Sequence, residues 1–138
     1  MTTFDYGPVE FYAIGFDGDH PGPGVLKAID DLVKSGTVNL LDLVFVRRSE
    51  DGELDIIEFA DTPDSDMLAL ELDGLAGEED VTDLAADLPP GSSAAILVVE
   101  LAWAKAFSQA LYDAGGAVIG RETVPAPVVN LFLSENEN

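Results

Sequence analysis

A proline- and glycine-rich loop holds the only histidine of the chain, together with two carboxylates. Asp17, Asp19 and His20 lie in the stretch DGDHPGPG. A calcium loop continues with further acids and a bidentate glutamate at fixed offsets, and a catalytic histidine needs an orienting acid and a nucleophile. Neither pattern follows in the sequence. We therefore predict an ordinary turn here, with no metal site and no catalytic residue.

A second candidate is Glu100, which ends an apolar run and precedes a helical pattern. A carboxylate at this position can cap the free amides of the helix, which is the simpler interpretation. The alternative is a ligand-facing carboxylate whose pKa is raised by apolar neighbours such as Trp103. Trp103 itself lies on the apolar stripe of the helix, so we expect it in the core, with a ligand pocket as the alternative.

The third candidate is Asp42, which lies within a predicted apolar strand that ends in two arginines. An unpaired carboxylate inside such a strand is costly, so a partner is expected. Arg47 or Arg48 could reach Asp42 or the acidic part of the chain across a dimer interface, or both could be solvated at the end of a hairpin. Together with Glu100 and Trp103, Asp42 completes our set of candidate ligand-binding residues.

The composition excludes several classes of function. The chain has 138 residues, with 27 acidic and 6 basic side chains and a net charge of -21. Nucleic acids and anionic membranes are poor partners for such a surface. The absence of cysteine excludes thiolate chemistry, and the glycines form no dinucleotide or phosphate-binding motif. We expect no cofactor.

No segment of the sequence has the length and composition of a membrane span. The most apolar window, residues 94–104, is shorter than the about 20 apolar residues that a bilayer requires and contains a glutamate. The N-terminus lacks the basic and apolar regions of a secretion signal. We expect a cytoplasmic protein without a transmembrane segment.

Apolar periodicity predicts a single α+β domain over residues 1–138. Two similar units, each a strand, a helix with a glycine stop and another strand, occupy residues 8–60 and 92–134, with an acidic connector at 61–91. Two split β-α-β units on one sheet make a ferredoxin-like two-layer sandwich. This sandwich would be enlarged by an extra hairpin strand at 53–60 and an added acidic helix, and its last strand would span Ala117 to Thr123.

The predicted strands are apolar on both faces, although right-handed crossovers place both main helices on the same face. The other face then needs the extra helices, a ligand cavity or a second subunit, because a bare apolar sheet would aggregate. We expect an isologous homodimer or higher homo-oligomer, with five candidate interface residues: Leu41, Leu43, Phe45, Tyr12 and Ile14.

An ordered set of short motifs covers most of the chain. It comprises Gly74-Leu75 with Asp80-Val81, Pro90-Gly91-Ser92 before an apolar strand, Glu100 with Trp103-Ala104, Gly115-Gly116, and Val124-Pro125-Ala126. On these motifs the chain resembles an uncharacterised bacterial domain family of unknown function, often labelled a membrane protein and loosely linked to general stress proteins. The resemblance implies a ferredoxin-like fold, without an assigned activity or catalytic residues.

Two hypotheses for function remain open at this point. The first is a non-enzymatic domain that self-associates through its sheet and acts as an accessory or binding protein, with a stress association implied by the resemblance. The second is a small-ligand sensor or enzyme with a pocket between sheet and helices near Glu100 and Trp103. An enclosed cavity with converging polar groups would favour the second hypothesis.

Overall fold

The protein is a mixed α+β domain in a computed structural model that describes residues 3–17 and 23–135. Most of the loop around His20 lies outside the described residues. Within these described residues, four strands and four α-helices follow one another: β1 (Val9–Asp17), α1 (Pro23–Lys34), β2 (Asn39–Arg48), β3 (Leu54–Glu58), α2 (Glu78–Leu84), β4 (Ser92–Glu100), α3 (Lys105–Asp113) and α4 (Ala126–Glu135). Short 3-10 helices occupy Phe59–Asp61, Ser65–Met67 and Ala102–Ala104.

The four strands form one antiparallel sheet in the order β1-β4-β2-β3. β4 lies between β1 and β2, which are joined by α1, so the chain contains one split β-α-β unit. The second expected unit is incomplete, because the residues from Ala117 to Thr123 form no strand. The prediction of a strand there is wrong, and the ferredoxin-like arrangement of two complete units is not confirmed.

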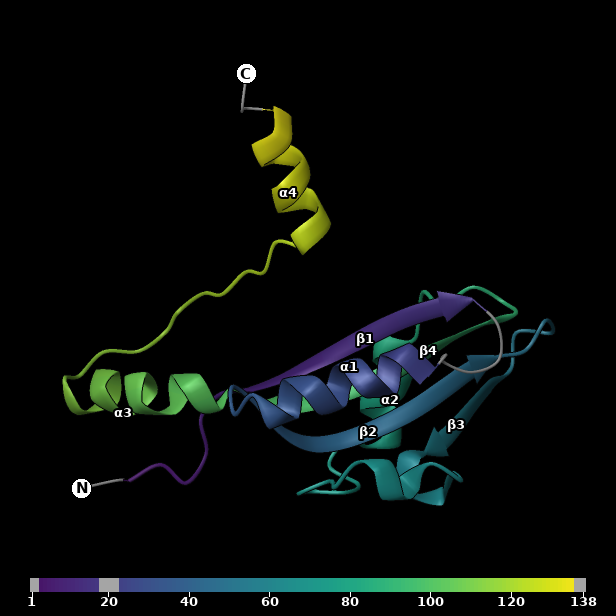
Figure 1. Ribbon diagram of the computed structural model, residues 1–138, viewed down its shortest axis with the longest axis horizontal. Coiled ribbons are helices and arrows are strands. Elements are labelled where there is room, and N and C mark those ends of the chain that lie inside the picture. The colour runs from purple at the N-terminus through teal and green to yellow at the C-terminus, as the bar shows by residue number, and fades with distance from the viewer. Residues whose placement is uncertain (1–2, 18–22, 136–138) are drawn as a thin grey trace.

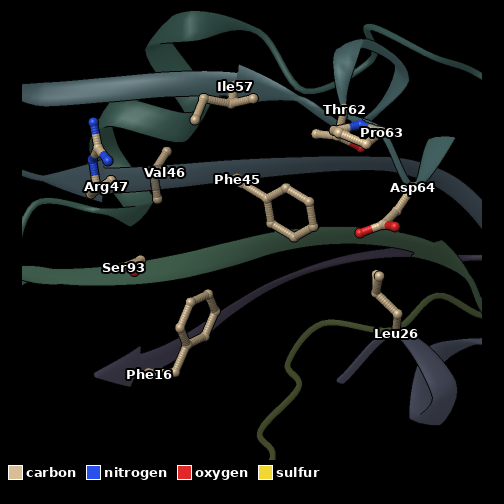
Figure 2. A pocket seen from close by; sticks show the side chains of 10 residues that line it. All are labelled: Phe16, Leu26, Phe45, Val46, Arg47, Ile57, Thr62, Pro63, Asp64 and Ser93. Carbon is tan, nitrogen blue, oxygen red and sulfur yellow. The ribbon is translucent and has the colours of Figure 1, made fainter. Parts of the chain in front are cut away.

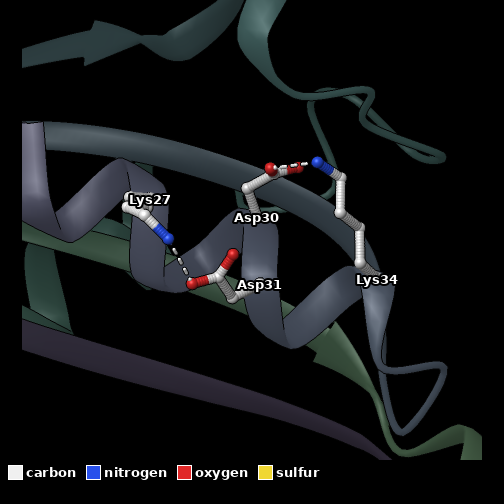
Figure 3. Close-up of polar contacts among 4 residues, drawn as sticks. All are labelled: Lys27, Asp30, Asp31 and Lys34. Carbon is white, nitrogen blue, oxygen red and sulfur yellow. Dashed lines mark hydrogen bonds and ion pairs between the residues drawn. The ribbon is translucent and has the colours of Figure 1, made fainter.

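One face of the sheet is covered by α1 (Figure 1). Leu26 and Ile29 of this helix pack against apolar side chains of β2 and β4 in the main core cluster. The outer face of α1 carries the ion pairs Lys27–Asp31 at 2.8 Å and Lys34–Asp30 at 2.7 Å (Figure 3). These exposed pairs add little stability, and they mark the solvated face of the helix.

The second face of the sheet is covered by α2 (Figure 1). Val81 and Ala85 at this helix pack with Ala76 against β2 and β4 in a separate core cluster. The two main predicted helices therefore do not share one face, because α3 runs away from the sheet and the acidic helix takes the opposite side. From the sequence, the second face could be covered by extra helices, a ligand cavity or a second subunit. The acidic helix α2 is the cover, so burying the middle of that face needs no second subunit.

A β-bulge in β2 changes the faces that its side chains occupy. The register with β4 shifts between Leu40 and Asp42, and an extra residue in one strand reverses the alternation that follows it. Leu40 and Leu43 consequently share the α1 face, whereas Leu41 and Val44 share the α2 face. Leu41 and Leu43, both expected at one interface, therefore lie on opposite faces of the sheet, and that expectation is wrong.

Arg48 at the end of β2 holds the C-terminal end of α2 against the sheet. Its guanidinium donates to the backbone carbonyls of Leu88 at 2.8 Å, Ala85 at 3.1 Å and Gly52 at 2.8 Å. A cation at the end of a helix also opposes the partial negative charge of its free carbonyls. Arg47 instead pairs with Asp55 across the hairpin at 3.1 Å.

Residues 115–135 form a C-terminal arm that leaves the body of the protein. Gly115, with φ of 82°, ends α3 in the left-handed conformation that favours glycine. An extended connection follows and leads to α4, which lies away from the sheet (Figure 1). No residue of the C-terminal arm is buried. α4 therefore contributes nothing to the core.

Candidate functional site

Glu100 is a buried carboxylate at the end of β4, with 3% of its surface exposed. Its Oε2 accepts a hydrogen bond of 2.6 Å from the backbone N–H of Gly7, and its Oε1 accepts one of 2.7 Å from the side-chain amide of Asn39. Both donors lie outside the helix that follows. Glu100 therefore connects the N-terminal segment to the start of β2, and the prediction that it caps the helix is wrong.

Trp103 lies on the surface with 60% exposure, so the expectation that it belongs to the core is also wrong. The helical stripe on which it was placed leaves the sheet, because α3 does not pack against it. The indole lines an open, mainly apolar groove of about 470 Å³ on the α1 side of β1. Other lining residues include Tyr12, Ile14, Leu32 and Arg121. The carboxylate of Glu100 does not line this groove.

Asp42 is completely buried on the α2 side of the sheet. Its Oδ1 accepts from the N–H of Leu43 at 2.9 Å, and its Oδ2 accepts from the N–H of Ala76 at 2.9 Å. The expected arginine partner is thus replaced by two backbone amides. The bulge creates this need, because it removes the regular ladder and leaves the carboxylate facing the loop before α2.

Two further acids approach Asp42, and the sequence analysis missed both. One carboxylate oxygen each from Asp42, Glu58 and Asp73 lie within 4.8 Å of one another. Oε2 of Glu58 is buried and has no hydrogen-bond partner among the described residues. Burial, and then the charges of Asp42, Asp73 and Asp61, raise the pKa of Glu58 above its usual value. No local spacing predicts this cluster, because its members come from β2, β3 and a loop.

Such a cluster offers oxygen ligands of the kind that hard cations prefer. However, both oxygens of Asp42 already accept backbone hydrogen bonds, and Asp73 is exposed. Burial and the neighbouring carboxylates instead account for the raised pKa of Glu58 without any bound ion. The cluster is therefore a place where carboxylates repel one another beside β3, and we assign it no ligand.

A second apolar pocket, of about 300 Å³, lies at the other end of the α1 face (Figure 2). The side chains of Phe16, Leu26 and Phe45 surround it, with Asp64 at its margin. Of the candidate interface residues, only Phe45 lines this pocket. Its polar groups are few and are spread around the rim, which suits packing more than recognition of a particular small molecule.

The candidate interface residues fall into two groups. Leu41 and Leu43 have no exposed surface, and Phe45 packs partly against the main core. Tyr12 and Ile14 are 39% and 37% exposed, and both lie on β1. Of the five candidate interface residues, only Tyr12 and Ile14 are therefore well exposed to a second molecule.

β1 is an edge strand whose described side chains are all at least partly exposed. It pairs with β4 along nine residues, and no other described strand pairs with it. Val9 and Phe11 are exposed to a similar extent as Tyr12 and Ile14, at 40% and 39%. A long apolar edge of this kind is a template for pairing with another strand.

Comparison with known families adds one finding. A family model, described as a family of unknown function, matches residues 5–137. Searches of curated proteins and of solved structures gave no match. Within residues 3–17 and 23–135, no helix has both the length and the apolar content needed to cross a membrane.

Proposed function

The chain belongs to the DUF6325 family, whose function is unknown, and we propose that it is a non-enzymatic domain that self-associates through the β1 edge of its sheet. The observation that carries the proposal is the apolar outer edge of β1, which pairs with no described strand. Under this proposal the domain acts as an accessory or binding protein in a larger process. The stress association implied by the resemblance would belong to that process.

The opposite edge of the sheet is a useful contrast. β3 has only five residues, two of which are the acids Asp55 and Glu58. Short, charged edge strands resist pairing with other chains. β1 has nine residues and carries four large apolar side chains with 37–40% exposure. Association through the sheet is therefore expected at β1 and not at β3.

Charge opposes contact between two copies over most of the surface, but less so at the β1 edge. A net charge of -21 repels acidic proteins and nucleic acids, and it also opposes contact between two copies. β1 is a place where this repulsion is weak, because Glu10 is neutralised by Arg121 at 2.9 Å and the strand contains one other acid. An isologous contact here would bring apolar surface together and keep the acidic connector apart.

The alternative, a ligand site near Glu100 and Trp103, is less well supported. Glu100 uses both carboxylate oxygens for internal hydrogen bonds, and Trp103 lines an open groove. A site for a small polar substrate is expected to have several convergent polar groups in an enclosed pocket. The groove beside Trp103 has mainly apolar walls, which suits contact with apolar protein surface.

Sedimentation velocity of the wild type, Ile14→Lys and Ile57→Lys tests the proposal. Ile57 lies on β3 with 40% exposure, so it is a matched control for Ile14 at 37%. We expect the wild type and Ile57→Lys to sediment as a dimer or larger species, and Ile14→Lys as a monomer. Circular dichroism checks that each variant is folded. A wild type that remains monomeric at concentrations well above micromolar would exclude the proposal.

A further inference from the structure

The C-terminal arm is as rich in apolar side chains as a buried element, yet these side chains are exposed. Ile119 is 99% exposed and Val118 65%, and in α4 Leu131 and Leu133 are 61% and 53% exposed. At about 100° per residue, the large apolar side chains of α4 cover more than half of its circumference. A helix of this kind is stable when it is covered on several sides.

The arm contains an extended segment without a described partner strand, and the body has a sheet edge without one. The segment from Ala117 to Thr123 is extended and rich in β-branched residues, which favour strands, yet it pairs with no described strand. β1 is a strand that lacks a neighbour on its outer side. One additional strand would satisfy both the segment and the edge, because main-chain groups of each are free to form a ladder.

We infer that residues 117–123 of a second copy form the strand that pairs with β1, so that two copies exchange their C-terminal arms reciprocally. This inference rests on the proposed self-association and names the segment that occupies the edge. α4 of each copy then lies over the apolar groove of the other copy, beside Tyr12, Ile14 and Leu32. When the exchange is reciprocal, two copies use both free edges and both arms, so the assembly closes as a dimer.

In one chain the arm reaches the β1 edge without pairing with it. The N-terminal segment attaches α3 to the body: the N–H of Phe4 donates to Gln109 at 2.7 Å, and Phe4 contacts Tyr112 edge to face at 5.2 Å. The arm therefore starts at the far end of α3, beyond the sheet (Figure 1). It returns past β1 closely enough for Arg121 to reach Glu10, but its backbone forms no ladder there.

The charge of the arm also fits an acidic body. Residues 115–135 contain one basic and two acidic side chains. Most of the net charge of -21 therefore lies on the rest of the chain, which opposes direct contact between two bodies. A nearly neutral arm can approach an acidic body at little electrostatic cost. Its arginine would then pair with Glu10 of the other copy, which keeps the ion pair seen within one chain.

Because the chain contains no cysteine, site-specific crosslinking gives a direct test. One chain carries Ala13→Cys on β1, a second chain with a different affinity tag carries Ile119→Cys, and the two are refolded together. A short thiol crosslinker is then added. We expect a covalent species that carries both tags and has twice the chain mass. The matched control replaces Ile119→Cys by Met67→Cys, which lies 53% exposed in a 3-10 helix and should give little product.

The outcomes separate the exchange from self-association alone. A dimer in sedimentation that crosslinks from Ala13→Cys to Ala13→Cys, and not to Ile119→Cys, would retain the proposed function and overturn the exchange. An Ala13→Cys/Ile119→Cys double variant that crosslinks only within one chain would also overturn it. A monomeric wild type would exclude both proposals.

A second variant tests the exchange without engineered thiols. Ile119→Asp changes a side chain that is 99% exposed in the single chain, so it removes nothing from that chain's core. We expect at least a tenfold weaker dimer, because the aspartate would enter the new strand. Met67→Asp is the control and should leave dimerisation unchanged. Equal dimer affinities for the wild type and Ile119→Asp would contradict the exchange.

Discussion

Arg121 of the C-terminal arm and Glu10 of β1 form an ion pair with a Nη2–Oε2 distance of 2.9 Å. Glu10 also accepts a hydrogen bond of 2.6 Å from the hydroxyl of Tyr12. This hydrogen bond, followed by burial, raises the pKa of Tyr12. The one basic residue of the arm thus lies at the open edge of the sheet, which links the two features on which the proposed assembly depends.

Salt should strengthen the proposed dimer. Each copy carries a net charge of -21, so repulsion between the bodies exceeds the gain from exposed ion pairs. Raising the salt from about 0.01 M to about 1 M shortens the Debye length from about 30 Å to about 3 Å. We expect the dissociation constant measured by sedimentation to fall across this range. A steady rise would show that attraction between charges holds the copies together.

Replacing Arg121 by Gln should weaken association by a factor of about thirty or less, because the dimer loses two ion pairs and each exposed pair contributes about 0.2–1 kcal/mol. The thermal stability of the monomer should not change, since the arm buries no residue. The measurement is the dimer dissociation constant, with Lys27→Gln as the control. Lys27 also forms one exposed ion pair, but it lies on the outer face of α1. Equal effects of both substitutions would contradict a specific role for Arg121.

Replacing Asp42 by Ala should destabilise the fold by about 2 kcal/mol, because the buried N–H of Ala76 loses its acceptor. Chemical denaturation followed by circular dichroism measures the change. Asp66→Ala, at an exposed position in a 3-10 helix, should lie within about 0.5 kcal/mol of the wild type. A similar small effect for Asp42→Ala would show that the bulge and its loop do not depend on the carboxylate.

Glu58→Gln should stabilise the protein at neutral pH by about 1 kcal/mol, because it removes a charge that is poorly compensated. The raised pKa of Glu58 means that the folded state binds this proton more tightly than the unfolded state. Its contribution to stability therefore falls as pH rises from the ordinary value of 4.5 through the folded pKa. The advantage of the variant should shrink toward acidic pH, where the wild-type side chain is neutral too.

Denaturation of the wild type and Glu58→Gln at several pH values checks this prediction. Glu53→Gln is the matched control, since Glu53 is an exposed glutamate that immediately precedes the first residue of β3. The difference between Glu53→Gln and the wild type should change little with pH. An advantage of Glu58→Gln that grows as the pH falls would have the wrong sign for a raised pKa.

Gly7→Ala should destabilise the protein by about 1–3 kcal/mol. A Cβ at this position would lie 2.7 Å from the carbonyl oxygen of Leu101 and 3.1 Å from Cα of Lys105, so backbone would have to move. The hydrogen bond from Gly7 to Glu100 would be lost with that movement. Gly24→Ala is the control, because a Cβ there meets nothing within 4 Å and favours the helix. Thermal melting should show a loss only for Gly7→Ala.

Local patterns in the sequence predicted many of the elements. The spacing of Leu26, Ile29 and Val33 was sufficient for α1, because helical periodicity depends only on neighbours a few residues apart. Apolar runs likewise located β2 and β4, and the hairpin strand expected at 53–60 contains β3. The charge distribution, and with it the exclusion of polyanionic partners, is also a property of the sequence alone.

The candidate site was less predictable, since its geometry depends on residues distant in sequence. Asp42 was recognised as a buried charge in need of partners, but Ala76 is 34 positions away and Glu58 comes from another strand. Glu100 was selected for its position after an apolar run, whereas its partners Gly7 and Asn39 come from elsewhere. Hydrogen bonds over such separations leave no periodic signal.

The sequence by itself determined which segments favour helix or strand, because those preferences arise from local sterics and from alternation along the chain. Only the tertiary structure decided which strands became neighbours. It placed β4 between β1 and β2, put α2 over the second face and left residues 117–123 unpaired. Strand pairing depends on the competition of all segments for the same edges, which a local pattern does not contain.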